Sequence, residues 1–173
     1  MTYKDIQLYR ELHTQNPAYG ASGIEYYHAI LDFINFHSPN SVLDFGCGKG
    51  TLVEKLRETT SGVIIDGFDP ALQKFEITRL KTYQMIITTD VLEHIHIDEL
   101  DTLFKDIKKF QPNTMYHVVC NREAVHILPD GSNAHKIVES VEWWAEKIKT
   151  SFDEYDVKYH VNLDKSNFCL VKK

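Results

Sequence analysis

The chain has 173 residues, of which 43% are hydrophobic and 25% are charged, and its formal net charge is −6. This length suits one domain over residues 1–173, with a core that buries roughly 70% of the unfolded surface. The acidic balance argues against extended contact with nucleic-acid phosphates, and no apolar run approaches the ~20 residues that cross a bilayer. We therefore expect neither a nucleic-acid nor a membrane partner.

Apolar periodicity predicts two helices before the first strand. The first covers about residues 3–14 and the second about residues 24–37, with a loop over residues 15–23 between them. Pro39 follows the second helix, and a proline just beyond the last periodic residue is typical of a helix end.

An apolar, β-favouring run over residues 41–45 is followed by Gly46, Gly48 and Gly50 at every second position, and a helical pattern begins at Thr51. Glycine supplies turn conformations that other residues adopt only with strain. A strand that runs through such a turn into a helix presents free backbone N–H groups to a ligand. The dinucleotide-binding spacing would need its third glycine at position 51, so a nicotinamide cofactor is disfavoured.

The rest of the chain alternates strands with helices. The pattern predicts strands over residues 63–68, 83–89 and 114–120, helices over residues 98–110 and 139–149, and a closing hairpin of strands over residues 155–161 and 167–171. Strands separated by helices indicate an α/β fold, here a mostly parallel sheet finished by a C-terminal antiparallel hairpin. Ligands of such sheets bind beyond the carboxyl ends of the strands.

Asp69 follows the second predicted strand and Asp90 the third, so both should converge with the glycine loop on one crevice. A carboxylate at the end of the second strand can accept hydrogen bonds from both hydroxyls of a ribose. Asp69 can also be an ordinary turn residue before Pro70, because Asp-Pro is common where loops begin. Asp66 is a competitor for the ribose role, although it lies inside the apolar run.

Two segments carry a family resemblance. The pattern Asp-x-Gly-x-Gly-x-Gly over residues 44–50 resembles motif I of the class I methyltransferases that use S-adenosyl-L-methionine. Asp90-Val91-Leu92-Glu93-His94-Ile95 resembles the segment that follows the fourth strand of that family. The resemblance implies a Rossmann-like class I methyltransferase fold and S-adenosyl-L-methionine as cofactor. The interval before the strand at residues 83–89 is short, so the family's usual third strand is expected to be reduced or missing, and the adenine pocket stays unassigned.

The resemblance also implies a cofactor site made by the N-terminal loop, the glycine loop and two strand ends. Its expected members are Tyr19, Gly20, Ser22, Asp44, Phe45, Gly46, Cys47, Gly48, Asp69, Pro70, Thr89, Asp90 and Val91. The segment around Tyr19 can equally be an ordinary connection between helices, and Asp44 can serve only to cap the glycine turn. Cys47 is expected to be a small loop residue rather than a nucleophile, because nothing nearby in the sequence lowers a thiol pKa.

Methyl transfer from a sulfonium requires alignment and, for some acceptors, a base that removes a proton. His94, His135 and Glu93 are the candidate bases. In the helix predicted over residues 139–149, Trp144 lies on the apolar stripe and Trp143 points roughly 160° away from it. We therefore expect an exposed Trp143 that helps to wall the acceptor site.

Several readings of function stay open. The favoured one is methylation of a small molecule or of a sugar- or nucleotide-like acceptor, with no metal. The alternatives are a cofactor-binding partner subunit without activity, a nicotinamide-dependent reductase, and a metal-assisted RNA 2′-O-methyltransferase. The last would use Asp90, Glu93, His94 and His135 as ligands. No Asn-Pro-Pro-Tyr segment follows the third predicted strand, which argues against amino-directed DNA methylation.

The cysteines bear on the cellular compartment. Cys47, Cys120 and Cys169 are far apart and odd in number, so we expect no disulfide framework. The first residues, Met1 to Asp5, lack a signal-peptide pattern. A reducing, cytoplasmic location is the resulting expectation, whereas the sequence does not decide the oligomeric state.

Overall fold

The computed structural model of the chain describes residues 3–173, so residues 1 and 2 of the expected domain lie outside the described range. Its elements follow in the order α1 (Ile6–Gln15), η1 (Ser22–Tyr26), α2 (Tyr27–His37), β1 (Ser41–Phe45), α3 (Thr51–Thr59), β2 (Ile64–Phe68), η2 (Gln73–Phe75), β3 (Met85–Thr89), η3 (Leu92–His94), α4 (Leu100–Lys108), β4 (Thr114–Cys120), α5 (Val141–Ser151), β5 (Tyr155–Asn162) and β6 (Lys165–Lys172). Among these residues, no helix combines the length and apolar character needed to cross a membrane.

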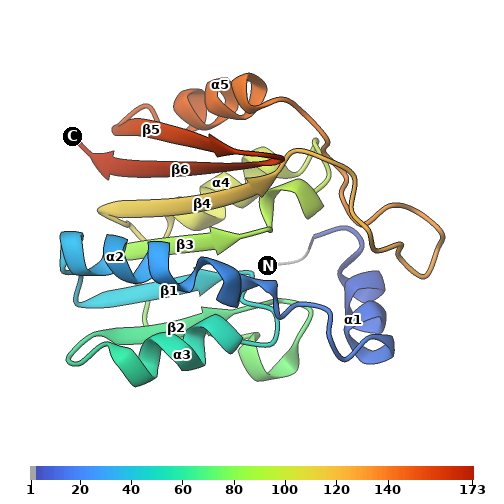
Figure 1. Cartoon of the computed structure of the whole chain (residues 1–173), viewed down its shortest axis with the longest axis horizontal. Helices are drawn as coiled ribbons and strands as arrows, with labels where there is room; N and C mark the ends of the chain where they lie inside the picture. The colour runs from blue at the N-terminus through green and yellow to red at the C-terminus, as the bar shows by residue number, and fades with distance from the viewer. Residues whose placement is uncertain (1–2) are drawn as a thin grey trace.

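A six-stranded sheet organises the described residues, with strand order β2-β1-β3-β4-β6-β5 (Figure 1). Strands β1 to β4 are parallel, β6 pairs antiparallel with β4, and β5 pairs antiparallel with β6. The prediction of a mostly parallel sheet with a C-terminal antiparallel pair is confirmed. Between β2 and β3 the described chain forms the short η2 turn and no strand, as expected from the short interval in the sequence.

Helices cover both faces of the sheet because its central strands are buried on both sides. One face packs against α4 and α5, with Leu43, Ile86 and Met115 of the sheet in the same cluster as Phe104 and Trp144. The other face packs against α2 and α3 through a second cluster that includes Ile34, Leu56, Val42, Met85 and Val118. Alternate residues of one strand therefore enter opposite cores.

The N-terminal helices differ in detail from the expectation. Helix α1 begins at Ile6 rather than at residue 3, because Asp5 adopts a left-handed conformation with φ 59°. The second predicted helix is divided into a 3-10 turn and α2, which begins at Tyr27. Gly23, a poor helix former, lies in that turn, where a Cβ would meet Thr89 Oγ1 at 2.9 Å. The turn thus brings backbone close to the end of β3.

Two segments lie beyond the carboxyl ends of the parallel strands: α1 and the long connection between β4 and α5 (Figure 1). A third apolar cluster joins them, with Tyr9 and Leu12 of α1 packed against Leu128 and Ala134 of the connection. The Tyr9 hydroxyl also donates a hydrogen bond to the Ala134 carbonyl at 2.7 Å. Together these segments form a roof over the edge of the sheet where ligands of such folds bind.

Candidate functional site

A cavity of about 340 Å³ lies beneath this roof. It is bordered by α1, the loop before η1, the glycine loop, the ends of β2 and β3, and the connection after β4. The sequence-predicted residues that line it are Tyr19, Gly20, Ser22, Phe45, Gly46, Cys47, Gly48, Asp69, Pro70, Thr89, Asp90, Val91, His94 and His135. Three others, Asp44, Glu93 and Trp143, are not among the lining residues.

The glycine loop passes against other backbone and side chains at short range. Gly46 and Gly48 have φ values of 81° and 51°, in the left-handed region where other residues are strained. A Cβ on Gly48 would meet the Gly20 carbonyl oxygen at 2.3 Å, and one on Gly46 would meet Val91 Cγ2 at 2.5 Å. Lys49 N donates to the same Gly20 carbonyl at 2.8 Å. The loop at residues 18–23 is therefore docked on the glycine turn.

Asp69 is buried at the end of β2, with its carboxylate against the glycine loop. Oδ2 accepts a hydrogen bond from Gly48 N and Oδ1 accepts one from Ala71 N, each at 2.9 Å. Burial raises the pKa of Asp69, while the two N–H donors and the nearby His13 oppose that effect. Each carboxylate oxygen has a second lone pair, so each can accept one more hydroxyl.

Asp66, the competitor for that role, faces elsewhere. Its carboxylate accepts hydrogen bonds from Tyr83 Oη at 2.7 Å and from Arg57 and Arg79. It does not line the cavity. The sequence offers both Asp66 and Asp69 for the ribose role, and in the structure only Asp69 of these two lines the cavity.

Asp44 lies on β1 just behind the glycine loop and is 1% exposed. Neither of its carboxylate oxygens has a hydrogen-bond partner among the described residues. Burial, together with the charge of Asp69, raises the pKa of Asp44 to about 8. Two unpaired oxygens in the interior are costly, and a cationic ligand near the loop would relieve that cost.

Asp90 is held in an ion pair that the sequence does not reveal. Its backbone has φ 54°, and its Oδ2 lies 2.9 Å from Lys165 Nζ, which lines the cavity from β6. The Tyr26 hydroxyl lies 3.3 Å from Asp90 Oδ1 and contacts Lys165 as well. Burial lowers the pKa of Lys165, but the hydrogen bonds to Tyr26 and Asp90 raise it above its ordinary value overall.

The candidate bases have different environments. The rings of His94 and His135 meet edge to face at 4.7 Å. Nδ1 of His94 lies 2.8 Å from the Ala134 carbonyl, and Nδ1 of His135 lies 2.6 Å from the Arg122 carbonyl. A carbonyl only accepts, so each Nδ1 carries a proton, and Nε2 holds the lone pair in the neutral form of each ring. Burial, reinforced by His135, lowers the pKa of His94 to about 3, so it is neutral at physiological pH.

Glu93 is fully buried on η3, and its Oε1 accepts a hydrogen bond from Cys120 N at 2.8 Å. Its Oε2 has no partner among the described residues. Burial and the charge of Asp90 raise the pKa of Glu93 to about 8. The carboxyl is mostly protonated at neutral pH and lies behind the cavity lining, which makes it a poor direct base for an acceptor.

Trp143 differs from the expectation. Instead of being exposed, its side chain is partly buried, packs against the core beneath α5 and meets the Trp144 ring at 5.0 Å. Trp144 is fully buried, as the apolar stripe predicts. The buried face of a short helix packed on a sheet is wider than its apolar stripe. A residue that flanks the stripe, such as Trp143, therefore still makes apolar contacts. The geometry gives Trp143 no contact with the cavity.

Several lining residues have no signal in the sequence. Tyr9 and His13 come from α1, Arg122 and His126 from the connection after β4, and Lys165 from β6. They lie in segments without a motif, and only the packing of the roof and the antiparallel pairing of β6 bring them to the cavity.

The family model that matches this chain describes a methyltransferase domain and covers residues 19–150, from the loop docked on the glycine turn through most of α5. The chain belongs to this methyltransferase family. The resemblance to class I methyltransferases seen in the two motifs is thereby confirmed. No curated protein sequence matches this chain.

Solved structures share the fold of this methyltransferase domain. The small RNA methyltransferase HEN1 superposes with a TM-score of 0.70 at 15% identity, over 87% of this chain and 25% of its own. The methyltransferase domain of bacterial CtHen1-CN gives 0.61 at 19% identity, over 84% and 96%. DhpI, in complex with SAH, gives 0.58 at 13% identity, over 97% and 95%. The domain thus spans about a quarter of HEN1, and these identities show the fold alone.

Proposed function

We propose that this methyltransferase domain uses S-adenosyl-L-methionine and acts on a small molecule or on a sugar- or nucleotide-like acceptor. The observation that carries the proposal is the position of Asp69, which lines the cavity and is bonded to the glycine loop through Gly48 N. Its carboxylate is held by two backbone N–H groups with lone pairs to spare for the vicinal hydroxyls of a ribose.

A cationic ligand beside the loop would favour the ionised forms of two buried acids. Asp44 and Asp69 are buried acids whose pKa values are raised, and Asp44 has no partner among the described residues. When bound, the cofactor supplies a sulfonium-activated methyl group. Tyr9 of the roof and Tyr19 of the loop before η1 line the same space, and an in-line displacement depends on the alignment of donor and acceptor. His135, which is partly exposed beside His94, borders the cavity where an acceptor proton can be removed.

Isothermal titration of the full chain tests the cofactor. S-adenosyl-L-methionine and its demethylated product should bind, whereas NAD should not. Asp69→Ala should weaken cofactor affinity by about tenfold or more, because the hydroxyls lose a charged hydrogen-bond acceptor. Asp156→Ala, which removes an exposed acid on β5, is the matched control and should bind as the parent does. Equal affinity in the parent and Asp69→Ala would refute the proposal.

Two observations favour a small acceptor over RNA: the pairing of Asp90 in the cavity lining and the net charge of the chain. A metal-assisted RNA 2′-O-methyltransferase would use Asp90 as a metal ligand, but the Asp90 carboxylate is paired with Lys165. The formal net charge of −6 also disfavours a long polyanion. Turnover measured with a panel of small hydroxyl, amine and thiol acceptors, beside a short RNA duplex, distinguishes the readings. Methylation of the RNA alone would contradict this acceptor class, and cofactor binding without any turnover would favour a partner subunit.

A further inference from the structure

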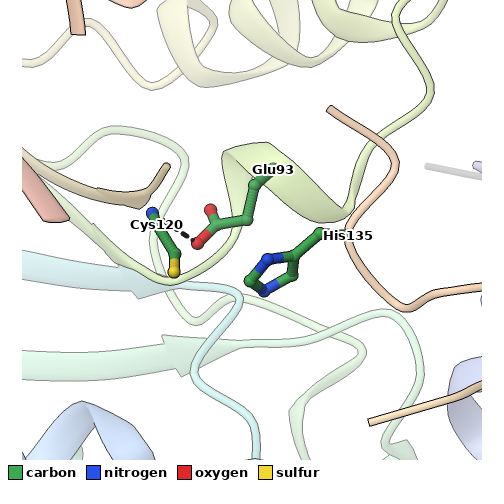
Figure 2. Close-up of side chains that lie close together, drawn as sticks. All are labelled: Glu93, Cys120 and His135. Atoms are coloured by element: carbon green, nitrogen blue, oxygen red, sulfur yellow. Dashed lines mark hydrogen bonds between the residues drawn. The ribbon is translucent and has the colours of Figure 1, made fainter. Parts of the chain in front are cut away.

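Three side chains with metal-binding chemistry lie close together (Figure 2). Glu93 comes from η3, Cys120 ends β4, and His135 comes from the connection that follows. One ligand atom from each lies within 4.8 Å of the others. Ligand atoms around a tetrahedral zinc ion stand roughly 3.5 Å apart, so closure around an ion needs shifts of only about 1 Å.

We propose that Glu93, Cys120 and His135 form a binding site for a thiophilic divalent cation, with Zn²⁺ as the ion that fits. The unpaired Glu93 Oε2 is an independent sign of a missing ligand, because it is a buried carboxylate oxygen with no partner among the described residues. The other oxygen, Oε1, stays bonded to Cys120 N at 2.8 Å and orients the carboxylate.

The surroundings of His135 suit a ligand. Its Nδ1 donates to the Arg122 carbonyl at 2.6 Å, which fixes the tautomer and leaves the Nε2 lone pair free. Ligation releases the thiol proton of Cys120 and the carboxyl proton of Glu93 to solvent. Under this proposal His135 is a ligand rather than the base. Cys120 and His135 both line the cavity, so a fourth coordination position would open toward bound molecules, as in catalytic zinc sites.

The chemistry separates this site from the carboxylate–imidazole set that the sequence suggests. That set requires Asp90, but the Asp90 carboxylate is paired with Lys165 at 2.9 Å. Cys120 takes its place in the cluster, and a thiolate selects zinc over magnesium or manganese. The nearby cations are themselves paired: Arg122 with Asp164 and Lys165 with Asp90. They therefore repel an incoming cation less.

Zinc titration of the chelator-stripped full chain tests the site. The parent should bind one Zn²⁺, and Cys120→Ser should lower the association constant by about tenfold or more because the thiolate is lost. Cys169→Ser, which changes a partly buried thiol on β6 outside the cavity lining, is the control and should bind as the parent does. Equal zinc affinity in the parent and Cys120→Ser overturns the proposal.

Cobalt substitution reports the sulfur directly. Co²⁺ in the parent and in Cys169→Ser should give a thiolate-to-metal charge-transfer band that is absent in Cys120→Ser. A parent without that band overturns the proposal, as does tighter binding of Mg²⁺ or Mn²⁺ than of Zn²⁺. If Cys120→Ser fails to fold, alkylation of the parent decides: Zn²⁺ should protect Cys120 and leave the rate at Cys169 unchanged. Equal rates at Cys120 with and without Zn²⁺ count against the site.

The metal site does not rest on methyl transfer, and the two proposals fail separately. Titration of the parent with S-adenosyl-L-methionine, in the presence and absence of Zn²⁺, reports the cofactor alone. Zinc binding without cofactor affinity would refute the proposed function and leave the metal site standing. Cofactor affinity without zinc binding would refute the metal site and leave the proposed function standing.

Discussion

Four aspartates near the strand ends have the same side chain but different partners, and therefore different roles. Asp66 is paired with arginines and Tyr83, and Asp90 is paired with Lys165. Asp69 is satisfied by backbone N–H groups, whereas Asp44 is unpaired. The residue type and position are visible in the sequence, but the partners come from residues elsewhere in the chain.

The unpaired Asp44 predicts a pH dependence of stability. The folded state raises its pKa from 3.8 to about 8, so between these values the folded chain holds a proton that the unfolded chain has lost. Stability therefore falls as pH rises through this window, by up to about 1.4 kcal/mol per pH unit. Asp44→Asn should flatten that fall in urea denaturation measured from about pH 5 to pH 8. An unchanged slope in the variant would show that Asp44 is ionised in the folded state.

At the scale of elements, the glycine loop is a turn whose backbone is packed on both sides. Gly48 approaches Gly20, Gly46 approaches Val91, and Gly50 approaches Phe75. Each contact joins the loop to a different neighbour, so the turn is positioned by the loop before η1, by the segment after β3 and by η2 together. The motif therefore predicts the turn but not what surrounds it.

Gly48→Ala tests this close packing. The residue has φ 51°, and the new Cβ would lie 2.3 Å from the Gly20 carbonyl oxygen. Gly62→Ala is a matched control, because Gly62 has φ 76° with nothing within 4 Å of its Cβ position. The control should lose about 1 kcal/mol from left-handed strain alone and keep cofactor affinity. Gly48→Ala should lose more stability and at least about tenfold in affinity. Equal losses of stability and affinity in both variants would contradict this prediction, because the loop at residues 18–23 would then move aside at little cost.

For the whole molecule, the site exists because two distant segments meet above the sheet. Helix α1 and the connection after β4 lie beyond the carboxyl ends of the parallel strands (Figure 1). They share the third apolar cluster, and both border the cavity. The Ala134 carbonyl accepts from both Tyr9 Oη at 2.7 Å and His94 Nδ1 at 2.8 Å. The roof is thereby tied to a histidine of the cavity.

Tyr9→Phe should loosen the roof. Loss of the buried hydroxyl removes one of two donors to Ala134 and costs about 1 kcal/mol. Hydrogen exchange in residues 121–140 should become faster by several-fold, since local opening needs less free energy. Tyr155→Phe, which loses a buried hydrogen bond to the Pro112 carbonyl, is the control. It should destabilise the chain without changing exchange in that segment, and similar exchange in both variants would contradict a local role for Tyr9.

The sequence by itself determined the sheet, the glycine turn and the acids at the strand ends. Periodicity and short-range steric preferences are local, so they survive without knowledge of the rest of the chain. The strand at residues 114–120 was predicted to the residue, and the antiparallel C-terminal pair is confirmed. Only the tertiary structure decided that Lys165 pairs with Asp90, that Tyr9 closes the roof, that Trp143 lies outside the cavity lining and that Cys120 meets Glu93 and His135. Those contacts join residues far apart in the chain, and no local pattern encodes which distant side chain fills a given space.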